Sequence, residues 1–127
     1  MSTTLPLTIT FPWPPSVNTY WRHPNGFHLI SKRGRAYRKA AQGVIWEMLK
    51  GRTPRIAEKV RVSVTAHRPD KRVRDLDNLF KCTLDALVHV GVLLDDSQIV
   101  HLNMRWAPDV KKGGALDILI EAAGGAQ

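Results

Sequence analysis

The stretch between residues 60 and 66 places the strongest constraint on how this chain folds. Small or β-branched apolar side chains alternate there with polar ones, in the order Val60, Arg61, Val62, Ser63, Val64, Thr65, Ala66. Successive side chains of a strand point to opposite faces of a sheet, so this pattern predicts a half-buried strand. The rest of the chain must then supply elements that cover the apolar face.

A first covering helix is predicted over about residues 35–49, with Gly51 as its stop. Its apolar side chains recur at steps of three and four, which marks one face of a helix. That face consists of Tyr37, Ala41, Val44, Ile45, Met48 and Leu49. Trp46 lies beside this face and is expected to be partly core.

A second helix is predicted over about residues 77–90, and Gly91 is a natural C-terminal stop. Cys82 lies in the middle of this helix without an activating base nearby in the sequence, so we interpret it as a packing residue. The run Val92-Leu93-Leu94 that follows is expected to be buried. The expected apolar face of the helix consists of Leu76, Phe80, Leu84, Leu87 and Val88.

Further strands are predicted over residues 5–11, 99–106 and 116–121. Prolines after Phe11 end the first strand, and Lys111-Lys112-Gly113-Gly114 supplies a turn between the last two. Residues 16–34 are polar and rich in turn formers, including Asn25-Gly26, and 122–127 are expected to fray. The order strand, helix, strand, helix, strand, strand predicts a single α/β (α+β) domain, residues 1–127, with two main helices packed on one mixed sheet.

Composition excludes several protein classes. With 127 residues, 43% of them hydrophobic, the chain can build a real core. No segment approaches the ~20 apolar residues that span a bilayer, and the first residues do not resemble a signal peptide. A single cysteine forms no internal disulfide, so we expect a reducing, cytoplasmic setting.

Charge is distributed unevenly along the chain. The net charge is +8, but residues 1–74 carry 15 Lys or Arg against 3 acids, and residues 75–127 carry 4 against 8. A basic first half of this kind favours a polyanionic partner, most often nucleic acid. The alternative at this point is a merely basic protein with no such partner.

Two aspartates, Asp75 and Asp77, stand where a strand gives way to the second helix. Backbone at a helix entry is not yet helical, so both carboxylates can turn toward one pocket. Each could instead cap the helix, where negative charge is well tolerated.

Lys81 and the pair Asp95-Asp96 extend this acidic pattern. Lys81 follows Asp77 by four residues, on the same helix face, and the short run before Asp95 can bring the second acidic pair back near the first. Converging carboxylates repel, and a Mg²⁺ or Mn²⁺ ion removes that conflict, activates a water and neutralises charge on a phosphate. These acids and the lysine therefore suffice for phosphodiester hydrolysis, although the same residues could form exposed ion pairs. Asp85 fits the ion-pair role better.

Other chemistries find little support. Five histidines show no paired metal-ligand spacing, a lone cysteine excludes a thiolate zinc site, and no glycine-rich phosphate loop is present. Trp13 and Trp21 lie in the basic, irregular region, where they could stack on bases, seat a partner chain or belong to the core.

The motifs together resemble the RusA family of Holliday junction resolvases over nearly the whole chain. The residues that carry the resemblance are Asp70-Lys-Arg-Val-Arg-Asp75-Leu-Asp77-Asn-Leu-Phe-Lys81, Asp85-Ala-Leu, Leu94-Asp95-Asp96-Ser-Gln-Ile-Val100, Phe11-Pro-Trp-Pro-Pro-Ser-Val-Asn18, Tyr37-Arg38 and Lys112-Gly-Gly. The resemblance implies a homodimer that binds four-way junction DNA and makes paired symmetric nicks with Mg²⁺, without an organic cofactor or a membrane.

Carried over by position, the resemblance implies Asp75, Asp77 and Asp96 as metal ligands and Lys81 as the catalytic lysine. Asp95 is a possible additional ligand. We expect Lys71, Arg72, Arg74, Lys111 and Lys112 to hold DNA phosphates. The alternatives are a non-catalytic DNA-binding protein whose aspartates are structural, and a nuclease of flaps, RNA or other branched nucleic acids.

Overall fold

The computed structural model describes residues 4–22, 29–72 and 74–124. The turn expected at Asn25-Gly26, Val73 and the last residues of the tail lie outside these ranges. Within them, no helix is long and apolar enough to cross a membrane.

Four strands form the main sheet, in the order β1-β6-β4-β5. β1 (Leu7–Phe11) and β4 (Val60–His67) each pair antiparallel with β6 (Ala115–Ala122), whereas β5 (Ile99–Trp106) runs parallel to β4. The sheet is therefore mixed. A second, two-stranded sheet joins β2 (Trp21–Arg22) to β3 (Leu29–Ile30).

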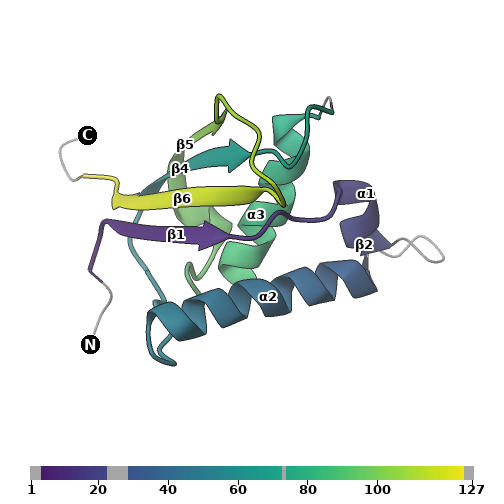
Figure 1. The fold of residues 1–127 in the computed structure, drawn as a ribbon. Helices are drawn as coiled ribbons and strands as arrows, with labels where there is room; N and C mark the ends of the chain where they lie inside the picture. Colours follow the sequence, from purple (N-terminus) through teal and green to yellow (C-terminus); the bar gives the residue numbers. More distant parts are fainter. Residues whose placement is uncertain (1–3, 23–28, 73, 125–127) are drawn as a thin grey trace.

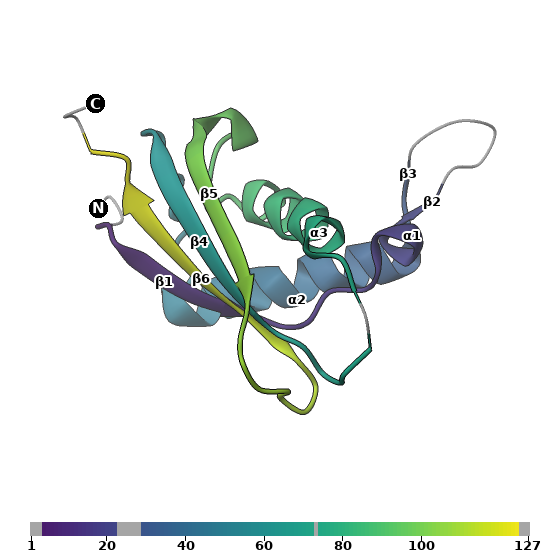
Figure 2. The ribbon, with the colours of Figure 1, turned by 90° about the horizontal axis from the view of Figure 1, so that it is seen from above.

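Two long helices, α2 (Lys32–Met48) and α3 (Leu76–His89), lie on one face of the main sheet, as Figures 1 and 2 show. The short helix α1 (Val17–Tyr20) follows β1, and a 3-10 turn, η2 (Asp96–Gln98), precedes β5. The apolar side of β4 faces the helices, with Val60, Val62, Val64 and Ala66 at most 2% exposed. The predicted fold class, two helices packed on one mixed sheet, is confirmed.

α2 begins three residues earlier than the periodicity predicts. Ser31 caps it, because the Ser31 hydroxyl oxygen accepts a hydrogen bond from the Gly34 N–H at 3.0 Å. The short elements α1, β2 and β3 fall in the region that the sequence describes only as turn-rich. They are too short for periodicity to reveal.

Four details of the predicted core are wrong. Trp46 is 64% exposed, Leu94 is 55% exposed and Met48 is 37% exposed, although all three were expected to be at least partly buried. The buried side of α3 is also rotated from the expected face, since Phe80 is only partly buried. The fully buried positions of this helix are Leu79, Cys82, Thr83, Ala86 and Leu87, which confirms Cys82 as a packing residue.

Topology brings four separate segments to one end of the sheet. β1, β4 and β5 end there and β6 begins there, so the segments that follow or precede them become neighbours. Figure 2 shows the β4–α3 and β5–β6 connections side by side at this end. A hydrogen bond of 2.9 Å from the Lys111 N–H to the Arg68 carbonyl joins them.

Candidate active site

Asp75 occupies the N-cap position of α3 without capping it. Its backbone is extended (φ −95°, ψ 133°), but its carboxylate accepts no hydrogen bond from the first turn of the helix. The structural alternative for this residue, a helix cap, is therefore not realised. The exposed carboxylate instead lines a hollow of about 550 Å³.

Aromatic, apolar and cationic side chains share this larger hollow with Asp75. Its walls are formed by Trp13, Pro14, Pro15, Ser16, Thr19, Arg33, Arg72, Arg74, Asn78 and Leu79. Three arginines at one opening suit an anionic ligand, and the hollow is larger than a single phosphate needs. Two of these arginines, Arg72 and Arg74, were predicted from the sequence to hold phosphates.

Arg74 is held in place by two neighbours. Its guanidinium carbon lies 5.6 Å from the centre of the Trp13 ring, and its Nη2 lies 2.8 Å from Asp70 Oδ1. Trp13 in turn stacks on Trp106, at the end of β5, with ring centres 6.3 Å apart. The hydrogen bonds that Asp70 accepts from the Arg72 backbone and the Arg74 side chain lower the pKa of its carboxyl. Trp13 therefore supports a cation beside the acidic site.

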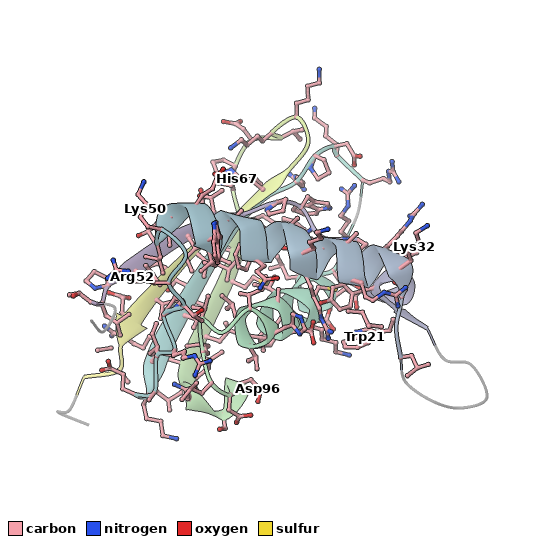
Figure 3. The ribbon with its side chains drawn as sticks, turned by 90° about the horizontal axis from the view of Figure 1, so that it is seen from below. Trp21, Lys32, Lys50, Arg52, His67 and Asp96 are labelled. Atoms are coloured by element: carbon pink, nitrogen blue, oxygen red, sulfur yellow. The ribbon has the colours of Figure 1, made fainter. Side chains whose placement is uncertain are left out.

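A second, smaller hollow of about 320 Å³ lies along the middle of α3. It is lined by Lys81, Leu84, Asp85, Val88, Asp95 and Asp96. Asp77 is exposed in the first turn of α3, four residues before Lys81 and on the same side of the helix. Figure 3 shows Asp96 beside α3 on the helix-covered side of the sheet. The structure thus brings Lys81 and the Asp95-Asp96 pair to one hollow, whereas the sequence analysis expected this pair near Asp75 and Asp77.

The two neighbouring aspartates of this pair have different environments. Asp95 caps η2, because its carboxylate accepts a hydrogen bond from the Ser97 N–H at 3.0 Å. Hydrogen bonds from the Ser97 hydroxyl and N–H lower the pKa of Asp95. Asp96 has no such partner among the described residues. The Asp95 carboxylate is therefore engaged in capping η2, whereas the Asp96 carboxylate is available to bind a ligand.

Gln98 anchors this turn, a role that the sequence did not reveal. The Gln98 side-chain oxygen accepts hydrogen bonds from the Leu94 and Asp95 N–H groups, both at 2.8 Å. Its amide nitrogen donates to the carbonyls of Ile56 and Glu58 at 2.7 and 2.9 Å. A buried amide with all these partners fixes the position from which Asp96 projects.

Pairing separates the aspartates into two groups. Asp70, Asp85, Asp95 and Asp117 all accept side-chain or backbone hydrogen bonds, three of them from Arg or His. Asp75, Asp77 and Asp96 form no ion pair with any described residue, although basic side chains line the same hollows. Asp109, in the β5–β6 connection, is also exposed and unpaired among the described residues. The three acids predicted as metal ligands therefore belong to the unpaired group without being its only members.

The unpaired acids do not converge within one chain. Asp75 lines the larger hollow and Asp96 the smaller one. Over residues 4–22, 29–72 and 74–124, no three His, Cys, Asp or Glu side chains stand close enough to hold one metal ion. The donor chemistry, unpaired carboxylates with a nearby lysine, suits a hard divalent cation. The geometry of a single chain supplies only part of a coordination shell.

The remaining basic residues predicted to bind DNA lie at the end of the sheet described above. Lys71 is exposed in the β4–α3 connection, and Lys111 and Lys112 are exposed in the β5–β6 turn. That turn packs on Trp13, since a Cβ at Gly114 would lie 2.9 Å from the Trp13 Cβ. The β5–β6 turn therefore lies against Trp13, a wall of the larger hollow, although none of the three lysines lines that hollow.

Arg33 and Asn78 were missed as site residues. Both line the larger hollow, from the first turns of α2 and α3. The excess of basic residues in the first half of the chain was the only signal for Arg33. Nothing in its spacing distinguished it from its basic neighbours.

Comparisons with known proteins identify the family of this chain. The chain matches the family model described as Endodeoxyribonuclease RusA over residues 12–121. It is 44% identical over 118 residues to a crossover junction endodeoxyribonuclease RusA of Enterobacteria phage 82, covering 91% of this chain and 94% of the relative. Proteins of the same name from Shigella sonnei (strain Ss046) and Escherichia coli (strain K12) are 42% and 41% identical over 117 residues, 92% of this chain and 95% of each relative. The chain therefore belongs to the RusA family of endodeoxyribonucleases.

Proposed function

We propose that this protein is a Mg²⁺-dependent, structure-selective DNA endonuclease that resolves Holliday junctions in DNA recombination and repair. It would do so by paired, symmetric hydrolysis of two phosphodiester bonds. The observation that carries the proposal is the set of unpaired carboxylates on and beside α3, bordered by an arginine-lined hollow. The names of the relatives agree with this activity.

The roles of the acids follow from their environments. Asp75, Asp77 and Asp96 would hold the metal, since their oxygens are not engaged elsewhere among the described residues. Bound Mg²⁺, or Mn²⁺ in its place, supplies a Lewis acid and an activated water. Lys81, without an ion-pair partner, would stabilise negative charge on the phosphate.

Substrate binding is assigned to the cations around the larger hollow. Arg72 and Arg74 would hold the phosphates nearest Asp75, and Lys71, Lys111 and Lys112 those further along the DNA. Contacts of this kind position a nucleic acid without reading its sequence, and they weaken as salt increases. Selectivity would then rest on the shape of the junction.

We also propose that the protein acts as a homodimer. A four-way junction has approximate two-fold symmetry and needs two cuts, so two identical sites suit it. The separation of Asp75 from Asp96 within one chain is a second reason, because a second copy is a source of the carboxylate that one chain does not bring near. A dimeric metal site predicts that Mg²⁺ binding weakens when the protein is diluted below its dimerisation constant.

The test compares wild type, Asp77→Asn and Glu47→Gln on a labelled mobile four-way junction, with Mg²⁺ and with EDTA. Glu47→Gln is the matched control, because it removes one exposed carboxylate from α2, outside both hollows. We expect paired nicks from wild type and from the control, only with metal. Asp77→Asn should lose cutting by a factor of about 1,000 or more and retain junction binding.

Two further results sharpen this test. Without metal, Asp77→Asn should lower the free energy of unfolding by no more than about 1 kcal/mol, because it removes an exposed charge from the first turn of α3 and no hydrogen bond. Tight binding with no cutting under any metal would favour a non-catalytic DNA-binding protein. Faster cutting of flaps or RNA in competition with junctions would indicate another branched substrate.

A further inference from the structure

Lys81 and Asp85 are neighbours on α3 that do not pair. They are four residues apart, the spacing at which oppositely charged helical side chains meet, and both line the smaller hollow. No ion pair joins them, and Lys81 has no ion-pair partner among the described residues. The Asp85 carboxylate therefore has an ion-pair partner on another element.

The ion-pair partner of Asp85 is Arg38 of α2. Its Nε donates to Asp85 Oδ2 and its Nη2 to Asp85 Oδ1, both at 2.8 Å, so the two side chains form a bidentate pair. The Tyr20 hydroxyl donates a further hydrogen bond to Asp85 Oδ2. The Arg38 guanidinium carbon also lies 5.8 Å from the centre of the Trp21 ring. Both oxygens of Asp85 are thus turned toward α1 and α2, away from a partner on its own helix.

The Arg38–Asp85 pair is only 19% exposed at each side chain. Charges screened this little by water attract a neighbouring opposite charge more strongly than charges on an open helix surface. If Arg38 were removed, the Asp85 carboxylate would lose its bidentate partner in the wall of the hollow. Lys81, one turn away and in the same hollow, is the only lysine or arginine of α3.

We propose that Arg38 is a positioning residue for Lys81. By occupying both oxygens of Asp85, Arg38 prevents that carboxylate from capturing the Lys81 ammonium, which stays free for the phosphate at the cutting site. This inference rests on the proposed function of Lys81. It assigns a catalytic consequence to an ion pair that touches neither metal nor DNA.

The decisive comparison is between Arg38→Gln and Asp85→Asn. Each variant breaks the same ion pair and leaves one half-buried charge, so a purely structural role predicts similar losses of activity. Our proposal predicts an asymmetry, because only Arg38→Gln leaves a carboxylate that can take Lys81. At a temperature where both variants are folded, Arg38→Gln should lower single-turnover cutting of the junction about tenfold, within the range for loss of one charge-stabilising group. Asp85→Asn should lower it no more than about twofold to threefold, a margin allowed for general effects of the broken pair.

Two controls complete the experiment. Junction affinity in EDTA should be unchanged in both variants, since neither residue lies in the arginine-lined hollow. The double variant Arg38→Gln/Asp85→Asn should recover most of the cutting rate. Equal losses in the two single variants, or no recovery in the double variant, would overturn the proposal.

A readout without metal or DNA separates this inference from the proposed function. Pairing with a carboxylate keeps a lysine protonated and slows its acylation. In the metal-free protein, the rate of Lys81 acetylation, read by peptide mass spectrometry, should fall in Arg38→Gln and return in the double variant. An unchanged rate would refute the capture of Lys81 by Asp85. Lack of cutting by wild type, with the acetylation pattern intact, would refute the nuclease assignment alone.

Discussion

The same three side-chain types, arginine, tryptophan and aspartate, occur together twice in this molecule, with different consequences. The inner triad is Arg38, Trp21 and Asp85, and the outer triad is Arg74, Trp13 and Asp70. In both, the guanidinium lies over an indole ring, at 5.8 and 5.6 Å, and reaches a carboxylate at 2.8 Å. The inner pair is 19% exposed at each side chain, whereas the outer pair is 21% and 42% exposed.

The two triads differ in the elements that they connect and in how exposed their carboxylates are. The inner triad is bidentate and joins α2 to α3, with Tyr20 of α1 as an additional donor. The outer triad is local, since Arg74 and Asp70 are four residues apart, and its arginine lines an open hollow. The two arginines are almost equally exposed, at 19% and 21%, so the difference in exposure lies in the carboxylates. The inner triad links two helices, whereas the outer arginine lines a hollow.

The largest expected difference between the triads is in folding stability. Arg38→Gln leaves Asp85 half-buried without its cation, and this should lower the free energy of unfolding by about 3 kcal/mol. Arg74→Gln should lower it by about 1 kcal/mol or less, because its pair is more exposed. Urea unfolding of the metal-free proteins measures both. Equal losses would show that the inner pair is no more important to the fold than the outer one.

The next largest expected effect on stability comes from disturbing Trp13, the indole ring that contacts Arg74. Gly114 has φ +69°, and a Cβ there would lie 2.9 to 3.0 Å from Trp13 atoms. Gly114→Ala should therefore lower the free energy of unfolding by about 2 kcal/mol, and weaken junction binding by displacing Trp13 and with it Arg74. Gly43→Ala is the control, since its Cβ would meet nothing within 4 Å in α2 and should stabilise the helix by about 1 kcal/mol. Thermal melts separate the two, and junction binding unaffected by Gly114→Ala would contradict the role given to Trp13.

DNA affinity should distinguish the triads in the opposite sense. Arg74→Gln should weaken junction binding in EDTA about tenfold and reduce the slope of log affinity against log salt by about one. Arg38→Gln should leave that slope unchanged, because Arg38 lines neither hollow. Titrations at several salt concentrations make the measurement. A change of slope in Arg38→Gln would place Arg38 in the DNA interface.

Much of the fold could be predicted from local patterns. Alternation between Val60 and Ala66 and the apolar periodicity of α2 and α3 located the principal elements to within about three residues. The spacing of Asp75, Asp77 and Lys81 predicted the acidic entrance to α3. Each of these features involves residues that are close together in the sequence, so a short repeating pattern of side chains is enough to predict it.

Long-range partners could not be predicted in this way. The four-residue spacing predicts an ion pair between Lys81 and Asp85. In the structure, Asp85 pairs instead with Arg38, which lies 47 residues away in the sequence. The stacking of Trp13 on Trp106 and the anchoring of the Asp95-Asp96 turn by Gln98 likewise depend on how the elements meet. No periodicity encodes such contacts. The same is true of the division of Asp75 and Asp96 between two hollows.

The smallest expected difference between the triads is in the pH at which each stops contributing to folding stability. Burial, and then the hydrogen bond to Asp85, raises the pKa of Tyr20, and burial raises the pKa of Tyr37, so both tyrosines should ionise at higher pH in the folded protein than in the unfolded chain. A raised folded pKa contributes stability that is complete below the unfolded pKa of about 10 and is lost as pH rises through the folded value.

Asp70 of the outer triad has the opposite sign. Hydrogen bonds from the Arg72 backbone and Arg74 lower its pKa, so its contribution is present above the unfolded value of about 3.9 and is lost as pH falls through the lower folded value. Phenolate absorbance and urea unfolding against pH measure the two limbs. Tyr20→Phe should reduce only the alkaline loss of stability, and Asp70→Asn only the acid loss. If the Tyr20 phenol ionised at its ordinary pKa in the folded protein, the inner triad would be open to water, and its contrast with the outer triad would disappear.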